Sequence, residues 1–505
     1  MSERLSMIPA DEHNEALVAN VRPPGWVNPT PRGRYNMVVI GAGSAGLVTA
    51  AGAAALGASV ALVESHLLGG DCLNYGCVPS KALIHSARQV KIARDAAACG
   101  AAGGGAVEVD FGAVMQRMRE IRSEISAHDS AKRFRNMGVD VFFGQARFVG
   151  PDCVDVAGQE LHFARACIAT GARPRAPDID GLAEAGFLTN ETVFSLTARP
   201  KRLAVLGAGP LGCELAQAMA RLGCRVTIIA RHDQILPRED AGAAALVAEA
   251  LAQDGVDIRR QATLRRAAVV DGGRELTFDD ETTVEVDEIL VAVGRAPVVD
   301  GLDLDAADVA HDVHRGVVVD DRLRTTNRRI YAAGDVCLQE KFTHAADAAA
   351  RIVLANALFF GHRSFRSLTI PHCTYTDPEI ASVGLTERAA GQQGIAIRTF
   401  TQSLSHVDRA ITDGRTDGMV CIHTRRRGDR IVGATIVGDR AGEMISEITL
   451  AMRMGAGLKK LAEVIHPYPT ISQAIQQAAD QYNRERLTPR VRMFFETLLR
   501  WRRGR

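Results

Sequence analysis

The sequence predicts an α/β protein in which one kind of βαβ unit occurs twice. Two stretches predict it: "YNMVVIGAGSAG" (residues 35–46) and "RLAVLGAGPLG" (residues 202–212) each place a glycine motif directly behind a short apolar strand. Length agrees, because 505 residues are enough for three domains of roughly 150 residues each. We therefore expect two Rossmann-like dinucleotide-binding domains, with room for a third domain behind them.

The first unit carries Gly41, Gly43 and Gly46 behind its strand, and "ASVALVE" returns as a second strand that ends at Glu64. In this pattern the first glycine permits a tight turn, the second lets the backbone approach a pyrophosphate, and the third lets helix pack on strand. The helix N-terminus then faces the phosphates. A carboxylate about 20 residues further on accepts hydrogen bonds from an adenosine ribose. These four residues predict a dinucleotide site.

The second unit has its glycines at Gly207, Gly209 and Gly212. Its return strand, "CRVTIIARHD", has no acid at its end, where Arg231 and His232 follow instead. A cationic fork suits the 2′-phosphate of NADPH, which a carboxylate would repel. We favour NADPH over NADH, with a solvated loop arginine as the alternative. Two dinucleotide sites in one chain imply that electrons pass between two cofactors.

Composition is that of an ordinary enzyme, with 47% hydrophobic and 24% charged residues. A formal net charge of +1 gives no reason to expect a nucleic acid partner. The N-terminus has acidic residues and no apolar core segment, so we do not interpret it as a secretory signal. Residues 37–63 carry no charge, but their glycines indicate a buried βαβ unit and not a membrane span.

The stretch "GGDCLNYGCVPSK" contains Cys72, Cys77 and Lys81. A structural zinc site lacks a second ligand pair at matching spacing. A structural disulfide does not suit a chain without an export signal, which we expect in the cytoplasm, where thiols stay reduced. A redox pair remains. Pro79 suits the first turn of a helix, and a helix N-terminus and the nearby Lys81 charge would both lower a thiol pKa. We interpret the remaining cysteines as small buried hydrophobic residues: Cys99, Cys153, Cys167, Cys213, Cys224, Cys337, Cys373 and Cys421.

The thiol motif resembles that of the class I pyridine nucleotide-disulfide (flavin disulfide) oxidoreductases, which include dihydrolipoamide dehydrogenase, glutathione reductase and mercuric reductase. The resemblance runs from about residue 35 to 483. It also rests on "IATGARP" (168–174), "GAGPLGCELAQ" (207–217), "VAVGRAP" (291–297), "IYAAGDV" (330–336) and "YTDPEIASVGLTE" (375–387). It implies an FAD domain, an NAD(P)H domain and a C-terminal α+β dimerisation domain in a homodimer.

The resemblance also implies domain boundaries and binding residues. The boundaries are a flexible extension over 1–34, an FAD domain over 35–183 and 301–365, an NAD(P)H domain over 184–300, a dimerisation domain over 366–484 and a basic amphipathic tail over 485–505. FAD would contact Gly41, Gly43, Gly46, Glu64, Lys81, Ala146, Thr170, Gly171, Gly334 and Asp335, the last at its ribityl chain. NADPH would contact Gly207, Gly209, Gly212, Arg231 and His232, and Gly294 and Arg295 would be further cofactor-binding residues.

For catalysis the resemblance implies that Cys77 lies against the flavin ring and that Cys72 is the exchange thiol that attacks the acceptor. Lys81 would sit near flavin N5 and pair with Glu214, since a partly buried cation needs a partner. The expected function is FAD-dependent transfer of electrons from NADPH through the Cys72–Cys77 disulfide to a soft metal ion, a disulfide or another small molecule.

The C-terminal part departs from the family pattern, in which a histidine directly precedes Pro-Thr and a glutamate follows. In "HPYPTISQA" Tyr468 takes the histidine position and Gln473 the glutamate position, while His466 lies two residues upstream. Tyrosine is a poor base at neutral pH. This favours a mercuric reductase-like enzyme, although the chain lacks the vicinal cysteines with which mercuric reductases end. The alternatives are dihydrolipoamide dehydrogenase with His466 as its base, and a non-catalytic redox-sensing or complex-assembly subunit.

Each end of the chain allows two interpretations. Residues 1–34 hold several prolines and are expected to form a solvated arm, unless Trp26 attaches them to the body. In the tail, Val491, Phe494 and nearby leucines fall on one helical face among many arginines. We favour a terminal helix docked on the dimer, with a weak membrane-surface contact as the alternative.

Overall fold

The computed structural model describes residues 7–101 and 107–504. The chain forms two compact units. The first unit comprises residues 1–207, 218–229 and 262–368, and the second comprises 208–217, 230–261 and 369–505. Because this division does not follow the expected domain boundaries, those boundaries stay a prediction.

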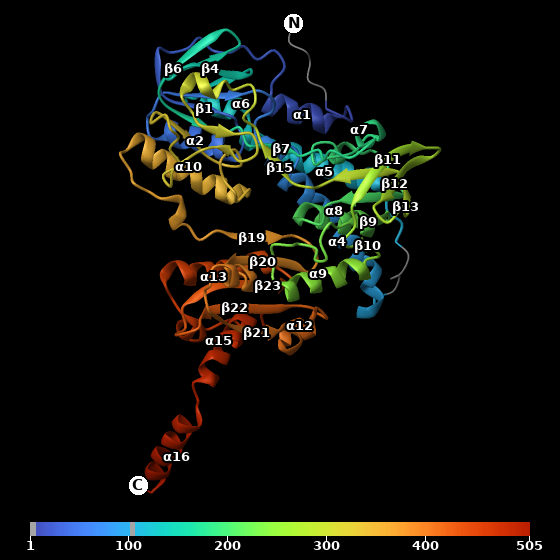
Figure 1. Cartoon of the computed structure of the whole chain (residues 1–505), viewed down its shortest axis with the longest axis vertical. Coiled ribbons are helices and arrows are strands. Elements are labelled where there is room, and N and C mark those ends of the chain that lie inside the picture. Colours follow the sequence, from blue (N-terminus) through green and yellow to red (C-terminus); the bar gives the residue numbers. More distant parts are fainter. Residues whose placement is uncertain (1–6, 102–106, 505) are drawn as a thin grey trace. The chain divides into compact units, whose positions relative to one another are not determined.

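The first unit contains two sheets of the expected kind and the helices around them (Figure 1). Its helices are α1 (Glu12–Val21), α2 (Ser44–Ala55), α3 (Gly70–Asn74), α4 (Cys77–Asp95), α5 (Phe111–Ser126), α6 (Ala131–Asn136), α7 (Leu182–Ala185) and α10 (Thr343–Leu358). Its strands are β1 (Arg34–Ile40), β2 (Val60–Glu64), β3 (Asp140–Phe143), β4 (Ala146–Gly150), β5 (Cys153–Val156), β6 (Gln159–Ile168), β7 (Ala172–Pro174), β8 (Arg202–Leu206), β9 (Arg225–Ile229), β11 (Leu264–Val270), β12 (Gly273–Phe278), β13 (Thr283–Val286), β14 (Glu288–Val291), β15 (Arg295–Pro297), β16 (His311–Asp312), β17 (Gly316–Val317) and β18 (Ile330–Ala332).

The larger sheet has the order β3-β2-β1-β6-β5-β4, with β18 beside the second half of β6. Strands β3, β2, β1, β6 and β18 run parallel, and β4 and β5 add an antiparallel edge. The expected βαβ unit over 37–63 is confirmed as β1, α2 and β2, with Met37 opposite Val60. In the described part of the chain, no helix is both long and apolar enough to cross a bilayer.

Helices α2 and α10 lie side by side on this sheet (Figure 1). Their contact is close because Gly52 of α2 has no side chain: a Cβ there would come within 2.4 Å of Leu354 Cδ1 in α10. Alanines dominate both helices, as "SAGLVTAAGAAA" in α2 shows, so the helix backbones approach each other and the strands. This packing fixes the two helix N-termini, where the site is built.

The second glycine motif follows β8, which pairs in parallel with β9 and β14. The antiparallel sheet β11-β12-β13 packs beside these strands. A shared core joins them, with Leu206, Ile229, Leu276 and Val291 among its buried residues. Helix α8 (Pro210–Arg221) begins directly behind the motif.

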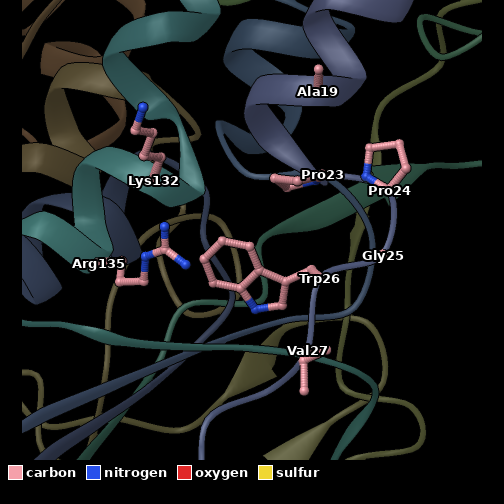
Figure 2. Close-up of a pocket in the computed structure, with 8 residues that line it drawn as sticks. All are labelled: Ala19, Pro23, Pro24, Gly25, Trp26, Val27, Lys132 and Arg135. Carbon is pink, nitrogen blue, oxygen red and sulfur yellow. The ribbon is translucent and has the colours of Figure 1, made fainter.

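The described part of the N-terminal segment is not the flexible arm that the prolines suggested. Residues 12–21 form α1, in which Leu17 and Val21 are fully buried. The Trp26 indole donates a hydrogen bond to the Val141 carbonyl at 3.1 Å. Arg135 stacks its guanidinium over the Trp26 ring at 5.1 Å, beside a pocket of about 450 Å³ (Figure 2). Apolar burial therefore holds residues 7–34 on the body, and the prediction for this part was wrong.

The second unit contains the five-stranded sheet β19-β20-β23-β22-β21, which is antiparallel throughout. Its core includes Ile422, Ile436, Ile448 and Ile475. The strands are β10 (Asp257–Arg259), β19 (Pro371–Thr374), β20 (Glu379–Gly384), β21 (Ile397–Ser403), β22 (Met419–Arg425) and β23 (Ile431–Gly438). The helices are α9 (Ala241–Gln253), α11 (Glu387–Gln392), α12 (Asp408–Thr412), α13 (Ala441–Met454), α14 (Leu458–Ala462), α15 (Gln473–Glu485) and α16 (Pro489–Arg503).

Candidate active site

The thiol motif folds into two short helical pieces that bring its cysteines together. Cys72 lies in α3, and Cys77 is the first residue of α4. Between them the chain turns at Gly76, where a Cβ would lie 3.0 Å from the Asp71 carbonyl oxygen. The Asn74 amide closes α3 by donating to the carbonyl oxygen of Gly70 at 2.8 Å. Both cysteines are free thiols, and a hydrogen bond joins them.

The two sulfurs differ in acidity. The hydrogen bond from Cys72 is the main cause that lowers the pKa of Cys77 to about 6; burial opposes it, while the Thr343 hydroxyl and the Lys81 charge add to it. The same hydrogen bond and burial raise the pKa of Cys72. At neutral pH the pair therefore holds one proton, on Cys72, and Cys77 is the thiolate.

Thr343 is a site residue that sequence reasoning missed. Its Oγ1 lies 3.3 Å from Cys77 Sγ, and it is the first residue of α10. The cysteine therefore meets the N-terminus of its own helix and a hydroxyl at the start of another, both of which favour an anion. The sequence shows a threonine that opens an alanine-rich helix, but nothing in it connects this residue to a cysteine 266 positions earlier.

Most other cysteines have the opposite chemistry. Cys153, Cys167, Cys213, Cys224 and Cys421 are buried, as expected for small hydrophobic residues, whereas Cys99 is exposed. Burial raises the pKa of Cys167 and of Cys224 to about 12. These two thiols therefore stay protonated at neutral pH, unlike Cys77.

Asp71, the residue before Cys72, is held by two partners. Its carboxylate accepts hydrogen bonds from Arg295 Nη1 at 2.7 Å and from Asn190 Nδ2 at 2.8 Å. Arg295 also lies 3.6 Å from Asp335, measured between Nε and Oδ2. Burial raises the pKa of Asp335, against the nearby charge of Arg295. Arg295 thus connects the thiol motif with "AAGDV" through two carboxylates.

The first glycine motif forms a cradle that fits a dinucleotide. Gly41 has φ of +100°, and a Cβ there would lie 2.4 Å from the Ala169 carbonyl oxygen; a Cβ on Gly46 would lie 1.8 Å from the Gly41 oxygen. At Gly43 a Cβ would meet only Gly70 Cα, at 3.8 Å. The roles expected for the three glycines are therefore sterically consistent: two are required by the protein itself, and Gly43 leaves room for a ligand beside the α2 N-terminus.

Glu64 faces this cradle from the end of β2. One carboxylate oxygen accepts the Ala42 N–H at 2.7 Å and the other accepts the His66 N–H at 2.7 Å. Burial is the main cause that raises its pKa, and these hydrogen bonds oppose the rise. The Ser65 hydroxyl also donates to this carboxylate, at 3.5 Å. A carboxylate has about four acceptor positions, so one remains for a ribose hydroxyl. The residues present fit FAD.

The structure brings other predicted FAD residues to the same strand ends. Thr170 follows β6 and donates its hydroxyl to the Val298 carbonyl oxygen at 2.6 Å, and Gly171 accepts the Val298 N–H through its own carbonyl oxygen. Gly334 meets α2, because a Cβ there would lie 3.2 Å from Ala45 Cβ. Ala146 is different: it lies buried in β4, inside the core behind these strand ends.

The second glycine motif repeats the steric pattern in part. Gly207 has φ of +114°, and a Cβ there would lie 2.5 Å from the Ala292 carbonyl oxygen, whereas nothing lies within 4 Å of a Cβ on Gly209. Gly212 is buried in α8. Gly294 has φ of +112° with no neighbour for a Cβ within 4 Å. Arg231 and His232 follow with exposed side chains, as a binding fork requires.

The expected pair of Lys81 and Glu214 stays a prediction, because these residues belong to different units. Lys81 lies one turn into α4, where its charge lowers the pKa of Cys77. Glu214 is buried in α8, and its carboxylate accepts the Tyr375 N–H at 2.8 Å.

Tyr468, at the family's histidine position, and His466, two residues upstream, each pair with a carboxylate. Tyr468 is 69% exposed and donates its hydroxyl to Asp408 at 3.0 Å. This hydrogen bond raises the pKa of Tyr468. His466 has only 5% of its side chain exposed, and its Nε2 lies 3.1 Å from the Glu447 carboxylate. Glu447 lies in α13, and sequence reasoning did not find it.

Comparisons with known proteins agree with this geometry. Residues 35–351 match the family "Pyridine nucleotide-disulphide oxidoreductase" and residues 370–479 match its dimerisation domain. Mercuric reductase of Lysinibacillus sphaericus is 32% identical over 89% of this chain and 83% of its own length. Dihydrolipoyl dehydrogenase of Thermus scotoductus is 33% identical over 89% of this chain and 98% of its own length.

Among solved structures, the Cu(II) complex of the HOCl-induced flavoprotein disulfide reductase RclA from Escherichia coli superposes with a TM-score of 0.81. It is 29% identical and covers 89% of this chain and 100% of its own. The predicted resemblance and the predicted fold class are confirmed. The chain thus belongs to the pyridine nucleotide-disulphide oxidoreductases, flavin-dependent enzymes that use FAD and a nicotinamide nucleotide and pair into homodimers through the C-terminal domain.

Proposed function

We propose that this enzyme transfers electron pairs from NADPH to the Cys72–Cys77 disulfide and from the resulting dithiol to a soft metal ion or another small acceptor. The observation that carries the proposal is the placement of Cys77 at the start of α4, with the Thr343 hydroxyl 3.3 Å from its sulfur. Together with Cys72 and the Lys81 charge, this arrangement lowers the pKa of Cys77 and favours a thiolate there. Two neighbouring cysteines of unequal acidity can take up an electron pair as a disulfide and pass it on as a dithiol, as enzymes of this family require. The proposal includes the domain boundaries and the cofactor contacts that the sequence analysis predicts.

Bound FAD supplies the step that passes an electron pair from the nicotinamide to the disulfide. Reduction breaks the S–S bond, takes up two electrons and one proton, and leaves Cys72 as thiol and Cys77 as thiolate. The Thr343 hydroxyl and the Lys81 charge stabilise that thiolate. They therefore favour the thiolate at Cys77 and the proton on Cys72, whose sulfur is the one that attacks the acceptor.

With a disulfide acceptor, the Cys72 sulfur loses its proton, attacks one acceptor sulfur and expels the other as thiolate. Cys77 then attacks Cys72, expels the second thiolate and restores the internal disulfide, so two electrons leave for each cycle. With a divalent soft metal ion, both sulfurs bind the ion as thiolates, and its binding releases the Cys72 proton. Two electrons then pass from the sulfurs to the ion, the internal disulfide forms again, and the reduced metal leaves. The second route needs no external base.

The C-terminal pairs favour the route without a base. A dithiol substrate must be deprotonated, and the usual group for that near neutral pH is histidine. Tyr468 is exposed but keeps its proton on the hydrogen bond to Asp408, while His466 is turned inward to Glu447. Similarity to mercuric reductases supports a metal acceptor, as does the neighbouring structure described as a Cu(II) complex.

NADPH is the proposed donor because Arg231 and His232 stand where an NADH enzyme has its carboxylate. A guanidinium pairs with a 2′-phosphate through two hydrogen bonds, which gives both affinity and selectivity. Both side chains are exposed and so accessible to a nucleotide.

A purified-protein assay tests the proposal. Oxidation of NADPH and of NADH is followed with mercuric ion, cupric ion, lipoamide, glutathione disulfide and a quinone as separate acceptors. We expect NADPH-linked turnover with a soft metal ion, lost in Cys72→Ser and in Cys77→Ser. Turnover with the metal that survives both substitutions would refute the thiol relay. Failure with every acceptor would favour a redox-sensing or assembly subunit.

Dihydrolipoamide dehydrogenase is the second candidate, because the imidazole of His466 is oriented by a carboxylate, as a catalytic base would be. It predicts NADH-linked turnover of dihydrolipoamide that is lost in His466→Ala and reduced in Glu447→Gln. Tyr468→Phe is the matched control, since it removes the neighbouring hydroxyl and leaves the imidazole. Activity that depends on Tyr468 and not on His466 would exclude this candidate.

A further inference from the structure

The last helix, α16, has no buried side chain. Its apolar residues face solvent in the chain on its own; Phe494 is 63% exposed and Trp501 55%. The match to the dimerisation domain ends at residue 479, so this helix is not part of the family's conserved body. An apolar face of this kind marks an interaction surface.

Capping residues favour the start of α16 even in the absence of tertiary contacts. The Thr488 hydroxyl accepts the Val491 N–H, and Pro489 occupies the first turn. Arg492 and Glu496 form an i,i+4 ion pair at 3.1 Å. A helix of about this length is only marginally stable in water without tertiary contacts. Contact with an apolar medium would supply the missing stabilisation.

The side chains of α16 separate into two faces at about 100° per residue. The apolar arc consists of Val491, Phe494, Phe495, Leu498, Leu499 and Trp501. The opposite arc carries Arg490, Arg492, Glu496, Arg500 and Arg503, with Met493 as its one large apolar residue. Arg502 falls on the apolar side in the last turn, where a long side chain can extend its charge to the edge of an apolar layer.

Charge decides between the partners that could cover this surface. Five arginines stand against one glutamate in α16, so a second copy of the helix would bring guanidinium groups against each other. A nucleic acid would match the cations but would leave six apolar side chains in water. An anionic lipid surface matches both arcs, because acyl chains take the apolar side and headgroup phosphates take the arginines.

We propose that α16 is a peripheral membrane anchor that lies in the headgroup region of an anionic bilayer. With 15 residues it is too short to span the hydrocarbon core. Aromatic side chains such as Trp501 and Phe495 suit the boundary between headgroups and acyl chains. The homodimer carries two such helices, one from each subunit. The anchor places the oxidoreductase at a membrane without a spanning segment.

The expected effects follow from the two arcs. Each arginine near an anionic surface contributes about fivefold to the partition coefficient. Each large apolar side chain that leaves water contributes more than about tenfold. Added salt should weaken the first contribution and leave the second.

The test uses the full-length, FAD-loaded dimer with vesicles of phosphatidylcholine that contain phosphatidylglycerol, and with vesicles of pure phosphatidylcholine. We expect salt-sensitive co-sedimentation with the anionic vesicles only. The chain has two tryptophans, so Trp26→Phe leaves Trp501 as the reporter, and its emission should shift to the blue on the anionic vesicles. Equal sedimentation with neutral vesicles, or none with either, would overturn the proposal.

Variants separate this surface from a dimer contact. A chain that ends at Leu487 should lose binding, remain a dimer by light scattering and keep its NADPH oxidation rate. The paired exchange Arg492→Phe with Phe495→Arg keeps composition and charge but disrupts the two arcs, so it should lower binding by more than about tenfold. If the shortened chain becomes monomeric, or if the exchange binds as well as the native sequence, α16 is not a membrane anchor.

Discussion

Replacing Thr343 by valine removes the hydroxyl beside Cys77 and keeps the side-chain shape. The Oγ1–Sγ distance is 3.3 Å. A hydrogen bond to a charged group contributes about 1.5 to 3 kcal/mol, and one pKa unit corresponds to about 1.4 kcal/mol. The surrounding protein partly desolvates the Cys77 sulfur, but the residue as a whole is exposed in the chain on its own. Solvent therefore screens the interaction, and the lower end applies. We expect the pKa of Cys77 to rise from about 6 by about one unit.

The assay is the alkylation rate of Cys77 by iodoacetamide as a function of pH, on reduced protein, with peptide mapping to separate Cys77 from Cys72. The rate midpoint should move upward in Thr343→Val and stay near the native value in Thr343→Ser. Thr449→Val is the control, since it deletes a hydroxyl that donates to the Ile445 carbonyl oxygen at 2.8 Å. An unchanged midpoint in Thr343→Val, or an equal shift in the control, would refute the role of Thr343.

Three further outcomes test the fold and the nucleotide site. His423 is fully buried. Burial alone would lower its pKa, but the Asp240 carboxylate at 3.1 Å acts in the opposite direction, and the pKa is raised to about 9. The pair therefore stabilises the fold below the ordinary histidine pKa of about 6.5 and loses up to about 3 kcal/mol as pH rises to about 9; the melting temperature should fall over this range, and less so in His423→Gln. Gly46→Ala should lower both the melting temperature and the FAD absorbance of the purified protein, because the added Cβ would lie 1.8 Å from the Gly41 oxygen; full FAD content would contradict the cradle. Arg231→Glu should raise the KM for NADPH by about tenfold or more and leave the KM for NADH nearly unchanged, and equal changes would speak against a phosphate contact.

The sequence predicted what depends on local pattern. The βαβ unit over residues 37–63 was predictable because the glycine motif directly follows one apolar strand and a second apolar strand follows the helix. The acidity of Cys77 was predictable in direction, because a helix start and Lys81 lie within a few residues of it. Contacts between distant segments were not predictable. Thr343 reaches Cys77 across 266 positions, and Glu447 reaches His466 from another helix.

The N-terminal segment shows why composition can mislead. Its prolines suggested a solvated arm, whereas Leu17 and Val21, one helical turn apart, bury the same face of α1. The cap at Asp11, which accepts the Asn14 N–H at 2.9 Å, was the local signal that outweighs the prolines. Single hydrophobic positions inside a polar segment therefore deserved more weight than the overall composition.

Two contacts join the first glycine loop, residues 41–43, to the start of α3. The Gly69 N–H donates to the Ala42 carbonyl oxygen at 2.9 Å, and a Cβ on Gly70 would lie 2.6 Å from Gly43 Cα. A side chain at Gly70 would therefore displace the backbone at Gly43. A shift of the backbone at Gly43 would therefore act directly on the start of α3, the helix that carries Cys72. A ligand that orders the glycine loop would by the same contacts hold that sulfur in place.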